Sequence, residues 1–307
     1  MSLIDLGGGT YQVDVHDMGV PERTAVYVLR GERTALVESG PTPGASYVLA
    51  GLEVLRRIND QHQGKPPITV RLVDWADEEG ARFGRSLLGS SACAGVNFDP
   101  NVERHRKDKD GISIEDAVRR CGVDIDQMRE SHKELKNAAA YLELHIEQGR
   151  VLEETGVRLG IVEAIAAPTR LRLELVGRAD HSGATPMPLR RDALAGAAEV
   201  ILAVERLARD APGVVGTVGT IRIEPGAINV VPGRAELGID VRSSDRETKA
   251  SVVEALRREI EEMARRRGLE RSVQTLTDEA PVALHPALAA LLERCARARG
   301  LPALRMV

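Results

Sequence analysis

A chain of 307 residues is long enough for two domains or one large α/β unit, and its 43% hydrophobic and 29% charged residues are typical of a globular protein. The formal net charge of −4 gives no indication of a nucleic-acid or anionic-membrane partner, and aromatic residues, at 2%, are too few for a base-stacking surface. Cys93, Cys121 and Cys295 are odd in number and widely spaced, which disfavours a disulfide framework and predicts a reducing, cytoplasmic environment. We also expect neither a signal peptide nor a membrane span.

The first 40 residues are expected to form β-structure. Residues 24–30 and 34–40 are apolar segments on either side of Gly31 and Glu32, a pattern typical of a β-hairpin.

An amphipathic helix and a buried strand are expected next. Val48, Leu52, Leu55 and Ile58 recur at steps of three and four residues, which indicates one apolar helix face. The apolar run 68–76 then predicts a buried strand. A helix that crosses between two parallel strands is the pattern of a βαβ unit.

Three carboxylates follow the end of this strand, at Asp77, Glu78 and Glu79. In an open α/β sheet, ligands bind beyond the carboxyl ends of the strands, so this position favours chemistry over packing. Adjacent carboxylates also repel each other unless a cation or a shared proton offsets the repulsion. From the strand end alone, an acidic turn exposed to solvent is an equally good interpretation.

A second group of polar residues follows a later strand. Residues 85–138 are expected to be mostly helical and polar, with the charged run 104–110 as an exposed face. The alternation in 141–146 predicts a strand that carries His145 on its polar face, and Gln148 follows shortly after its end. Imidazole is the commonest metal ligand among side chains, although a lone histidine is more often structural.

The pattern changes near residue 169 and predicts a second domain. The order β-α-β-β-α-β is that of a ferredoxin-like split βαβ unit, and its self-contained pattern indicates an insertion. The predicted strands are 171–176, 214–223, 235–241 and 272–276, and the predicted helices are 192–208 and 247–267. A final helix over 286–299 returns to the first domain.

This second domain carries three further candidate residues. His181 lies at the centre of a loop rich in Gly, Ser, Thr and Pro, and Asn229 lies in the segment 226–233. Arg242 follows on a strand, and its guanidinium is suited to the recognition of a planar carboxylate. The alternative interpretations are ordinary turns and a strand arginine without a ligand.

Together these motifs resemble a known family. From about residue 48 the chain resembles the zinc-dependent amidohydrolases of the aminoacylase/carboxypeptidase clan. It is most similar to the branch of N-carbamoyl-L-amino-acid hydrolases, to which allantoate amidohydrolase and β-ureidopropionase are related. The resemblance rests on five segments in register, which are 49–55, 78–84, 145–149, 181–187 with 191–193, and 229–233.

The resemblance implies an α/β fold. An αβα catalytic domain with a mixed, mostly parallel sheet would comprise residues 46–167 and an incomplete segment 277–307. A ferredoxin-like α+β domain at 168–276 would serve as lid and dimerisation domain, so a homodimer is expected.

The resemblance also implies roles for residues of the first domain. Glu78 would be the general base that takes a proton from a metal-bound water. Glu79 and His145 would each bind one of two divalent ions (zinc, manganese or cobalt), and Gln148 would lie near the substrate. Two such ions lower the pKa of water and polarise a carbonyl group.

The remaining roles fall to the inserted domain. His181 would reach the partner subunit's site and stabilise an oxyanion, while Asn229 and Arg242 would bind the substrate carboxylate. The expected reaction is hydrolysis of a non-peptide carbamoyl C–N bond in a small molecule, giving an amino acid, carbon dioxide and ammonia.

The chain departs from the family pattern in its metal ligands. The family's upstream His-x-Asp is missing, because His16 and Asp17 are adjacent, and the bridging aspartate falls on Pro43. The family's last metal histidine lies in a Ser-Gly-Ala-Gly-His-Asp segment that would begin at about Val307, where the sequence stops. Since a metal site needs about four donors per ion, we expect weak metal binding and little activity.

The first 45 residues have a different resemblance. Residues 7–14 and 25–41 resemble the opening strands of metallo-β-lactamase-fold hydrolases, but the His-x-His-x-Asp-His motif of that fold is absent. We therefore expect a chimeric chain joined near residues 46–51.

Three other functions stay open at this point. One is a catalytically inactive dimerising protein, and another is an allantoate amidohydrolase. A metallo-β-lactamase-type hydrolase is disfavoured by its missing motif.

Overall fold

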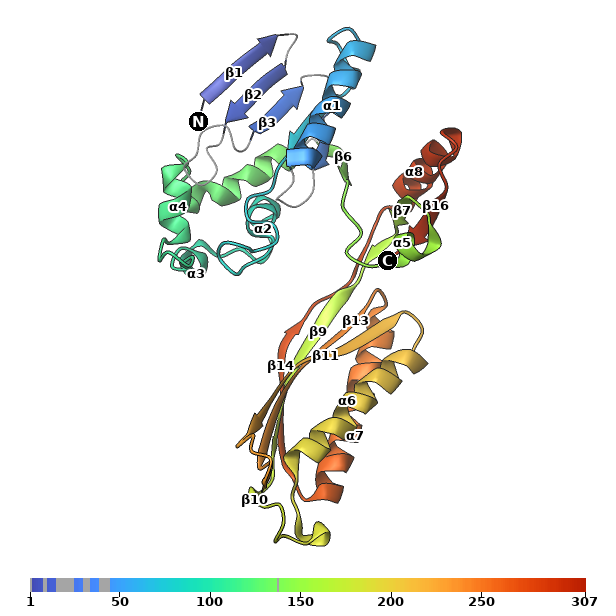
Figure 1. Cartoon of the computed structure of the whole chain (residues 1–307). Helices are drawn as coiled ribbons and strands as arrows, with labels where there is room; N and C mark the ends of the chain where they lie inside the picture. Colours follow the sequence, from blue (N-terminus) through green and yellow to red (C-terminus); the bar gives the residue numbers. More distant parts are fainter. Residues whose placement is uncertain (1, 8–9, 15–24, 30–33, 39–44, 137) are drawn as a thin grey trace. The chain divides into compact units, whose positions relative to one another are not determined.

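The computed structural model describes residues 2–7, 10–14, 25–29, 34–38, 45–136 and 138–307, and its chain forms two compact units (Figure 1). The first unit comprises Met1–Gln148 and the second Gly149–Val307. No helix in the described part of the chain is long and apolar enough to cross a membrane.

The first unit contains a six-stranded sheet in the order β1-β2-β3-β5-β4-β6. β1, β2, β3 and β5 pair in antiparallel fashion, whereas β4 is parallel to both β5 and β6. The strands are β1 (Ser2–Gly7), β2 (Thr10–Asp14), β3 (Ala25–Leu29), β4 (Thr34–Glu38), β5 (Thr69–Val73) and β6 (Ala138–Glu143).

This sheet corrects two expectations. It is mixed, as expected, but more of the pairs between described strands are antiparallel than parallel, in part because β1 and β2 are only two residues apart in the sequence and so short a connection joins antiparallel strands. The hairpin expected between 24–30 and 34–40 is wrong, because β5 lies between β3 and β4.

The expected βαβ unit is confirmed. β4 and β5 are parallel and are connected through α1 (Ala45–Gln61). Leu55 of α1 packs with Val70 and Leu72 of β5 in a small buried cluster. Helix and strand approach closely at Gly51, where an added Cβ would lie 2.6 Å from Cδ1 of Leu72.

Short helices follow β5, as expected from the sequence. They are α2 (Leu88–Ala94), α3 (Pro100–Glu103), α4 (Ile114–Arg120) and η2 (Ile125–Leu135), and they enclose a core that includes Phe83, Phe98, Ile114 and Ile125. The charged run 104–110 is mostly exposed, but the side chain of Asp108 is only 4% exposed because it pairs with Arg82.

The second unit contains the expected ferredoxin-like fold. Its strands form an antiparallel sheet in the order β11-β13-β9-β14, which is the order of a split βαβ unit. The elements are β9 (Ala167–Val176), α6 (Ala193–Asp210), β11 (Val214–Glu224), β13 (Arg234–Ser243), α7 (Arg246–Arg267) and β14 (Glu270–Asp278).

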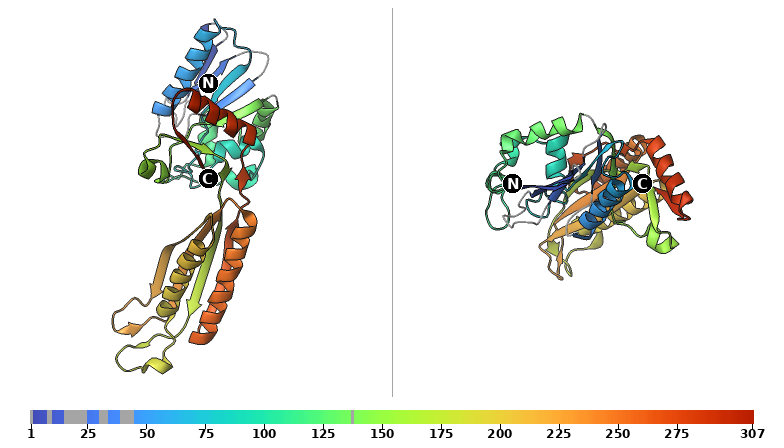
Figure 2. Two further views of the ribbon diagram at one scale, coloured as in Figure 1. Left: turned by 90° about the vertical axis from the view of Figure 1, so that its right-hand side faces the viewer. Right: turned by 90° about the horizontal axis from the view of Figure 1, so that it is seen from above.

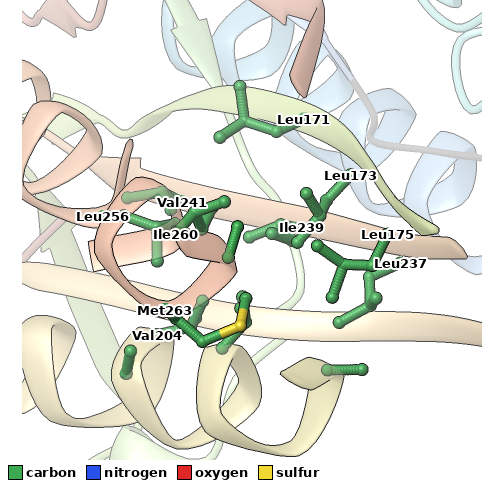
Figure 3. Packing of buried hydrophobic residues seen from close by; sticks show 14 of the residues in the cluster. Leu171, Leu173, Leu175, Val204, Leu237, Ile239, Val241, Leu256, Ile260 and Met263 are labelled. Atoms are coloured by element: carbon green, nitrogen blue, oxygen red, sulfur yellow. The ribbon is translucent and has the colours of Figure 1, made fainter. Parts of the chain in front are cut away.

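Helices α6 and α7 lie side by side on one face of this sheet (Figures 1 and 2). The core between these helices and the sheet is aliphatic, as the composition requires, and includes Leu173, Leu237, Ile239 and Ile260 (Figure 3). Residues between the buried ones on β9 and β13 are more exposed, and many of them are charged. The period-two pattern thus leaves the other face of the sheet polar.

Short strand pairs flank this fold. β8 (Ala164–Ile165) pairs with β15 (Val282–Ala283), and β7 (Leu159–Val162) is parallel to β16 (Ala303–Met306), which follows α8 (Pro286–Ala298). The chain therefore enters and leaves the ferredoxin-like fold through neighbouring strands. The domain boundaries expected at 167/168 and 276/277, and the foreign origin of residues 1–45, stay predictions.

Candidate active site

The candidate residues of the first unit lie on segments that follow β5 and β6. Both strands are parallel to β4, which lies between them, so their carboxyl ends meet at one edge of the sheet. β5 ends at Val73 and β6 at Glu143, a few residues earlier than expected for each strand. His145 therefore lies in the segment after β6 and not on the strand.

Glu79, His145 and Gln148 are brought together at this edge, as the resemblance to the family implies. Oε1 of Glu79 is 3.9 Å from Nε2 of His145. The same oxygen accepts a long hydrogen bond of 3.4 Å from Nε2 of Gln148. Residues more than 60 positions apart in the sequence thus share one carboxylate oxygen.

Glu78 lies beside this group in surroundings that oppose its charge. Burial raises the pKa of the Glu78 carboxyl, the nearby charges of Glu79 and Glu143 raise it further, and His145 partly offsets them. A carboxyl whose pKa is raised toward neutral pH is suited to general base catalysis.

A hydrogen-bond chain beside Glu78 is a feature that sequence reasoning missed. Nε1 of Trp75 donates to the hydroxyl of Tyr141 at 3.2 Å, and that hydroxyl donates to Oε2 of Glu143 at 3.0 Å. The sequence signal for Glu143 was the alternation after residue 141, which places Glu143 on the same polar face as His145. The chain holds a third carboxylate near Glu78.

The described residues do not complete a two-metal centre. Glu79 and His145 are two adjacent donors, whereas zinc takes four ligands and a bridged pair of ions needs more. Among the described residues, no group of three or more His, Cys, Asp and Glu could hold a metal ion. The expected departures from the family's ligand pattern, at His16, Asp17 and Pro43, lie outside those residues.

In the second unit, His181 and Asn229 are brought together. β10 (Asp180–His181) pairs with β12 (Val230–Val231), and the backbone N–H of Ser182 donates to the carbonyl of Asn229 at 3.0 Å. Nδ1 of His181 accepts a hydrogen bond from the N–H of Gly183 at 3.1 Å, which leaves Nε2 as the ring's other polar atom.

Arg242 lies far from that pair. It stands near the end of β13, eight residues after Arg234, and a strand of that length extends roughly 26 Å at about 3.3 Å per residue. Its guanidinium makes two hydrogen bonds with the carboxylate of Asp240, at 2.9 and 3.0 Å, and lines a cavity of about 500 Å³. The structure thus does not bring Arg242 to Asn229 within this unit.

Comparison with known proteins gives a consistent result. The model of the Peptidase family M20/M25/M40 matches residues 42–306. An N-carbamoyl-L-amino acid amidohydrolase from Geobacillus stearothermophilus is 37% identical over 282 residues, which are 92% of this chain and 68% of the relative. A ureidoglycolate hydrolase from Oryza sativa subsp. japonica is 34% identical over 81% of this chain and 52% of its own length.

A solved structure is also similar. The amidase of the hydantoinase/carbamoylase family from Burkholderia multivorans has a TM-score of 0.81 and 29% sequence identity, and the match covers 100% of this chain and 73% of that one. The chain thus spans between about half and three quarters of the length of these relatives.

Proposed function

We propose that this chain, which belongs to the Peptidase family M20/M25/M40, is an amidohydrolase of linear carbamoyl C–N bonds. Within the family it belongs to the branch of N-carbamoyl-L-amino acid amidohydrolases, allantoate deiminases and ureidoglycolate hydrolases. Its proposed substrates are N-carbamoyl-L-amino acids. The observation that carries this proposal is the convergence of Glu78, Glu79, His145 and Gln148 at one edge of the first sheet.

In the proposed reaction, water adds to the carbamoyl carbon and Glu78 accepts its proton. The C–N bond to the amino acid then breaks, and the proton passes to the leaving nitrogen. The products are the free amino acid and carbamic acid, which decomposes to carbon dioxide and ammonia. The raised pKa of Glu78 supports its role as the proton carrier.

We propose that Glu79 and His145 bind zinc, manganese or cobalt only weakly, since they are two donors where the chemistry needs about four per ion. The expected activity of this chain is correspondingly low. A catalytically inactive dimerising protein is the second candidate, and the incomplete donor set among the described residues favours it.

The inserted domain supplies the other proposed groups. His181 would stabilise the oxyanion, and Asn229 and Arg242 would bind the substrate carboxylate. A small substrate is too short to contact Asn229 and Arg242 of one chain, since roughly 20 Å or more of strand separates them. The proposal therefore includes a homodimer in which these residues come from different copies. The cytoplasmic location also stays a prediction.

Ammonia release tests the proposal. The purified chain is incubated with N-carbamoyl-L-amino acids or allantoate and with zinc, manganese or cobalt, and is compared with Glu78→Gln. We expect slow release from a carbamoyl amino acid, reduced about 10²-fold or more by Glu78→Gln, because the amide cannot accept the proton.

Three results would contradict parts of this proposal. Equal release by both proteins would favour the inactive dimerising protein. Tight, near-stoichiometric zinc binding in calorimetry, together with rapid turnover, would overturn the expectation of an impaired site. Release from allantoate alone would identify the alternative substrate.

A further inference from the structure

Asp77 differs from its two acidic neighbours because the backbone uses both of its carboxylate oxygens. Oδ1 accepts a hydrogen bond from the N–H of Arg82 at 3.0 Å, and Oδ2 accepts one from the N–H of Phe83 at 3.1 Å. Asp77 itself has a positive φ of 46°, a conformation that Asp tolerates better than most residues. The carboxylate thus closes a loop over the five residues that follow it.

Glu78 and Glu79 lie in a segment that we name the acid loop (residues 74–89). Hydrogen bonds within this loop fix the peptide groups next to both residues. Four consecutive carbonyls accept hydrogen bonds from later residues of the loop. These bonds are Gly89 N to Ala76 O at 2.9 Å, Gly80 N to Asp77 O at 3.2 Å, Leu87 N to Glu78 O at 2.5 Å and Ser86 Oγ to Glu79 O at 3.5 Å.

Two glycines show how tightly the acid loop is packed. An added Cβ at Gly80 would lie 2.6 Å from backbone atoms of Arg85 and Ser86, and φ at Gly80 is +71°. An added Cβ at Gly89 would lie 2.8 Å from the backbone nitrogen of Ala76. Backbone atoms cannot move aside as a flexible side chain can, so the loop has little freedom to rearrange.

Two ion pairs fix the far side of the acid loop. Nε of Arg82 is 3.1 Å from Asp108, and Nε of Arg85 is 2.7 Å from Glu103. The side chains of Asp108 and Glu103 are only 4% and 8% exposed. Arg82 also donates its backbone N–H to the carboxylate of Asp77, the residue directly before Glu78. This hydrogen bond connects the anchored side of the loop to the side that carries Glu78.

We propose that Asp77 is a positioning residue, whose carboxylate clamps the acid loop so that Glu78 and Glu79 face the segment after β6. The inference rests on the proposed function in giving Glu78 and Glu79 their chemical roles. The role proposed for Asp77 is to hold the loop and not to contact the reacting atoms, because each of its carboxylate oxygens accepts a backbone N–H within the acid loop.

Two substitutions separate the effect of the hydrogen bonds to the Asp77 carboxylate from the effect of the positive φ at this residue. Asp77→Gly keeps the freedom for positive φ and removes both acceptors, whereas Asp77→Asn keeps one acceptor. Asp124→Gly is the matched control, because Asp124, at the N-terminus of η2, also accepts a backbone N–H, from Asp126 at 2.9 Å, and this bond involves no residue of the acid loop.

Hydrogen exchange of the full chain is the direct measurement. We expect the amides of Arg82 and Phe83 to exchange about 10-fold faster or more in Asp77→Gly, less so in Asp77→Asn, and at the original rate in Asp124→Gly. Exchange in Asp77→Gly at the rate of the unchanged chain would overturn the proposal.

The kinetic measurement separates positioning from a general loss of stability. With cobalt in excess, we expect Asp77→Gly to lower kcat about 10- to 100-fold and to leave KM within about two-fold, because displacement of Glu78 affects the attacking water and not substrate binding. Asp77→Asn should recover part of kcat. An unchanged kcat in Asp77→Gly, beside an active parent chain, would overturn the proposal.

The two proposals fail in different ways. If the parent chain hydrolyses no carbamoyl substrate, the proposed function fails, and hydrogen exchange decides whether Asp77 clamps the acid loop. If the parent chain is active and the exchange rates are unaffected, the clamp fails alone.

Discussion

At the scale of single residues, Lys249 is a buried charge whose partners lie at the end of the ferredoxin-like sheet. The residue is 2% exposed, and its Nζ donates to the carbonyl of Glu279 at 2.5 Å and lies 3.2 Å from Oδ1 of Asp278. The hydroxyl of Thr169 donates to the same oxygen at 2.6 Å. Asp278 thus connects the start of α7 with β9 at the point where the chain enters and leaves this fold.

The charge on Asp278 is expected to make stability depend on pH. The hydrogen bond from Thr169, followed by that from Lys249, holds the pKa of Asp278 below its ordinary value of 3.8. A depressed carboxyl pKa adds stability above the unfolded-state pKa, and this stability is lost as the pH falls through the folded-state pKa. Because the side chain of Asp278 is 58% exposed, solvent screens its interactions, and Asp278→Asn should lower the free energy of unfolding at pH 7 by only about 0.5–1 kcal/mol, and by less near pH 3.

Urea unfolding at both pH values measures this difference. Asp210→Asn is the control, because Asp210 is exposed and we expect a change within about 0.5 kcal/mol. The double variant Lys249→Met/Asp278→Asn should be more stable than Asp278→Asn, since it removes the buried charge that has lost its partner. An effect of Asp278→Asn that is equal at pH 7 and pH 3 would contradict the argument.

The candidate site shows which proximities could be predicted before the structure. The resemblance to the family implied that Glu79, His145 and Gln148 lie together, and the structure brings them together because parallel strands have their carboxyl ends at one edge. The different use of Asp77 could not be predicted, since an acceptor for backbone N–H groups has the same residue type as a ligand. The distance of Arg242 from Asn229 depends on strand direction and length, which the motifs alone do not contain.

At the scale of elements, strand existence was predicted better than strand pairing. Apolar segments marked β3, β4 and β5, but β5 lies between the two strands that were expected to pair. Pairing partners depend on contacts between residues distant in the sequence, whereas the hairpin signal at Gly31 and Glu32 is local. In the second unit, by contrast, the topology was predicted correctly. The alternating pattern on β9 and β13 and the two amphipathic helices both indicated the ferredoxin-like fold.

The core of the ferredoxin-like fold is expected to depend on its aliphatic packing. Leu237 of β13 is fully buried beneath α6 and α7, and few aromatic side chains are available to fill a cavity there. Leu237→Ala should lower the free energy of unfolding by about 2–5 kcal/mol. Leu202→Ala on the exposed side of α6 is the control and should change it by less than about 0.5 kcal/mol. Thermal unfolding followed by circular dichroism compares them, and equal midpoints would contradict the assignment of the core.

At the scale of the whole molecule, the edges of the ferredoxin-like sheet indicate where a second copy would bind. Among the described strands of this sheet, β11 and β14 each have one neighbour. Edge strands expose backbone N–H and C=O groups, and proteins often protect them with charges. β14 carries Glu270, Arg271 and Asp278 and exposes one large apolar side chain, Leu276, whereas β11 carries Arg222 and Glu224 and exposes three, Val215, Ile221 and Ile223. The larger number of exposed apolar side chains on β11 favours it as the edge that pairs in the proposed homodimer.

We expect this pairing to be antiparallel, with the same strand of a second copy, because a two-fold axis brings identical surfaces together. Lysines at Ile221 and Ile223 would add like charges to the same edge of both copies and would disfavour association. The variant Ile221→Lys/Ile223→Lys should therefore sediment as a monomer at concentrations where the parent chain is a dimer, while Val102→Lys, an exposed position on α3, should leave the dimer intact.

A dimer that persists in the double variant would exclude the β11 edge, and a monomeric parent chain would exclude the homodimer. Because the proposed function takes Asn229 and Arg242 from different copies, loss of the dimer should also abolish the slow release of ammonia.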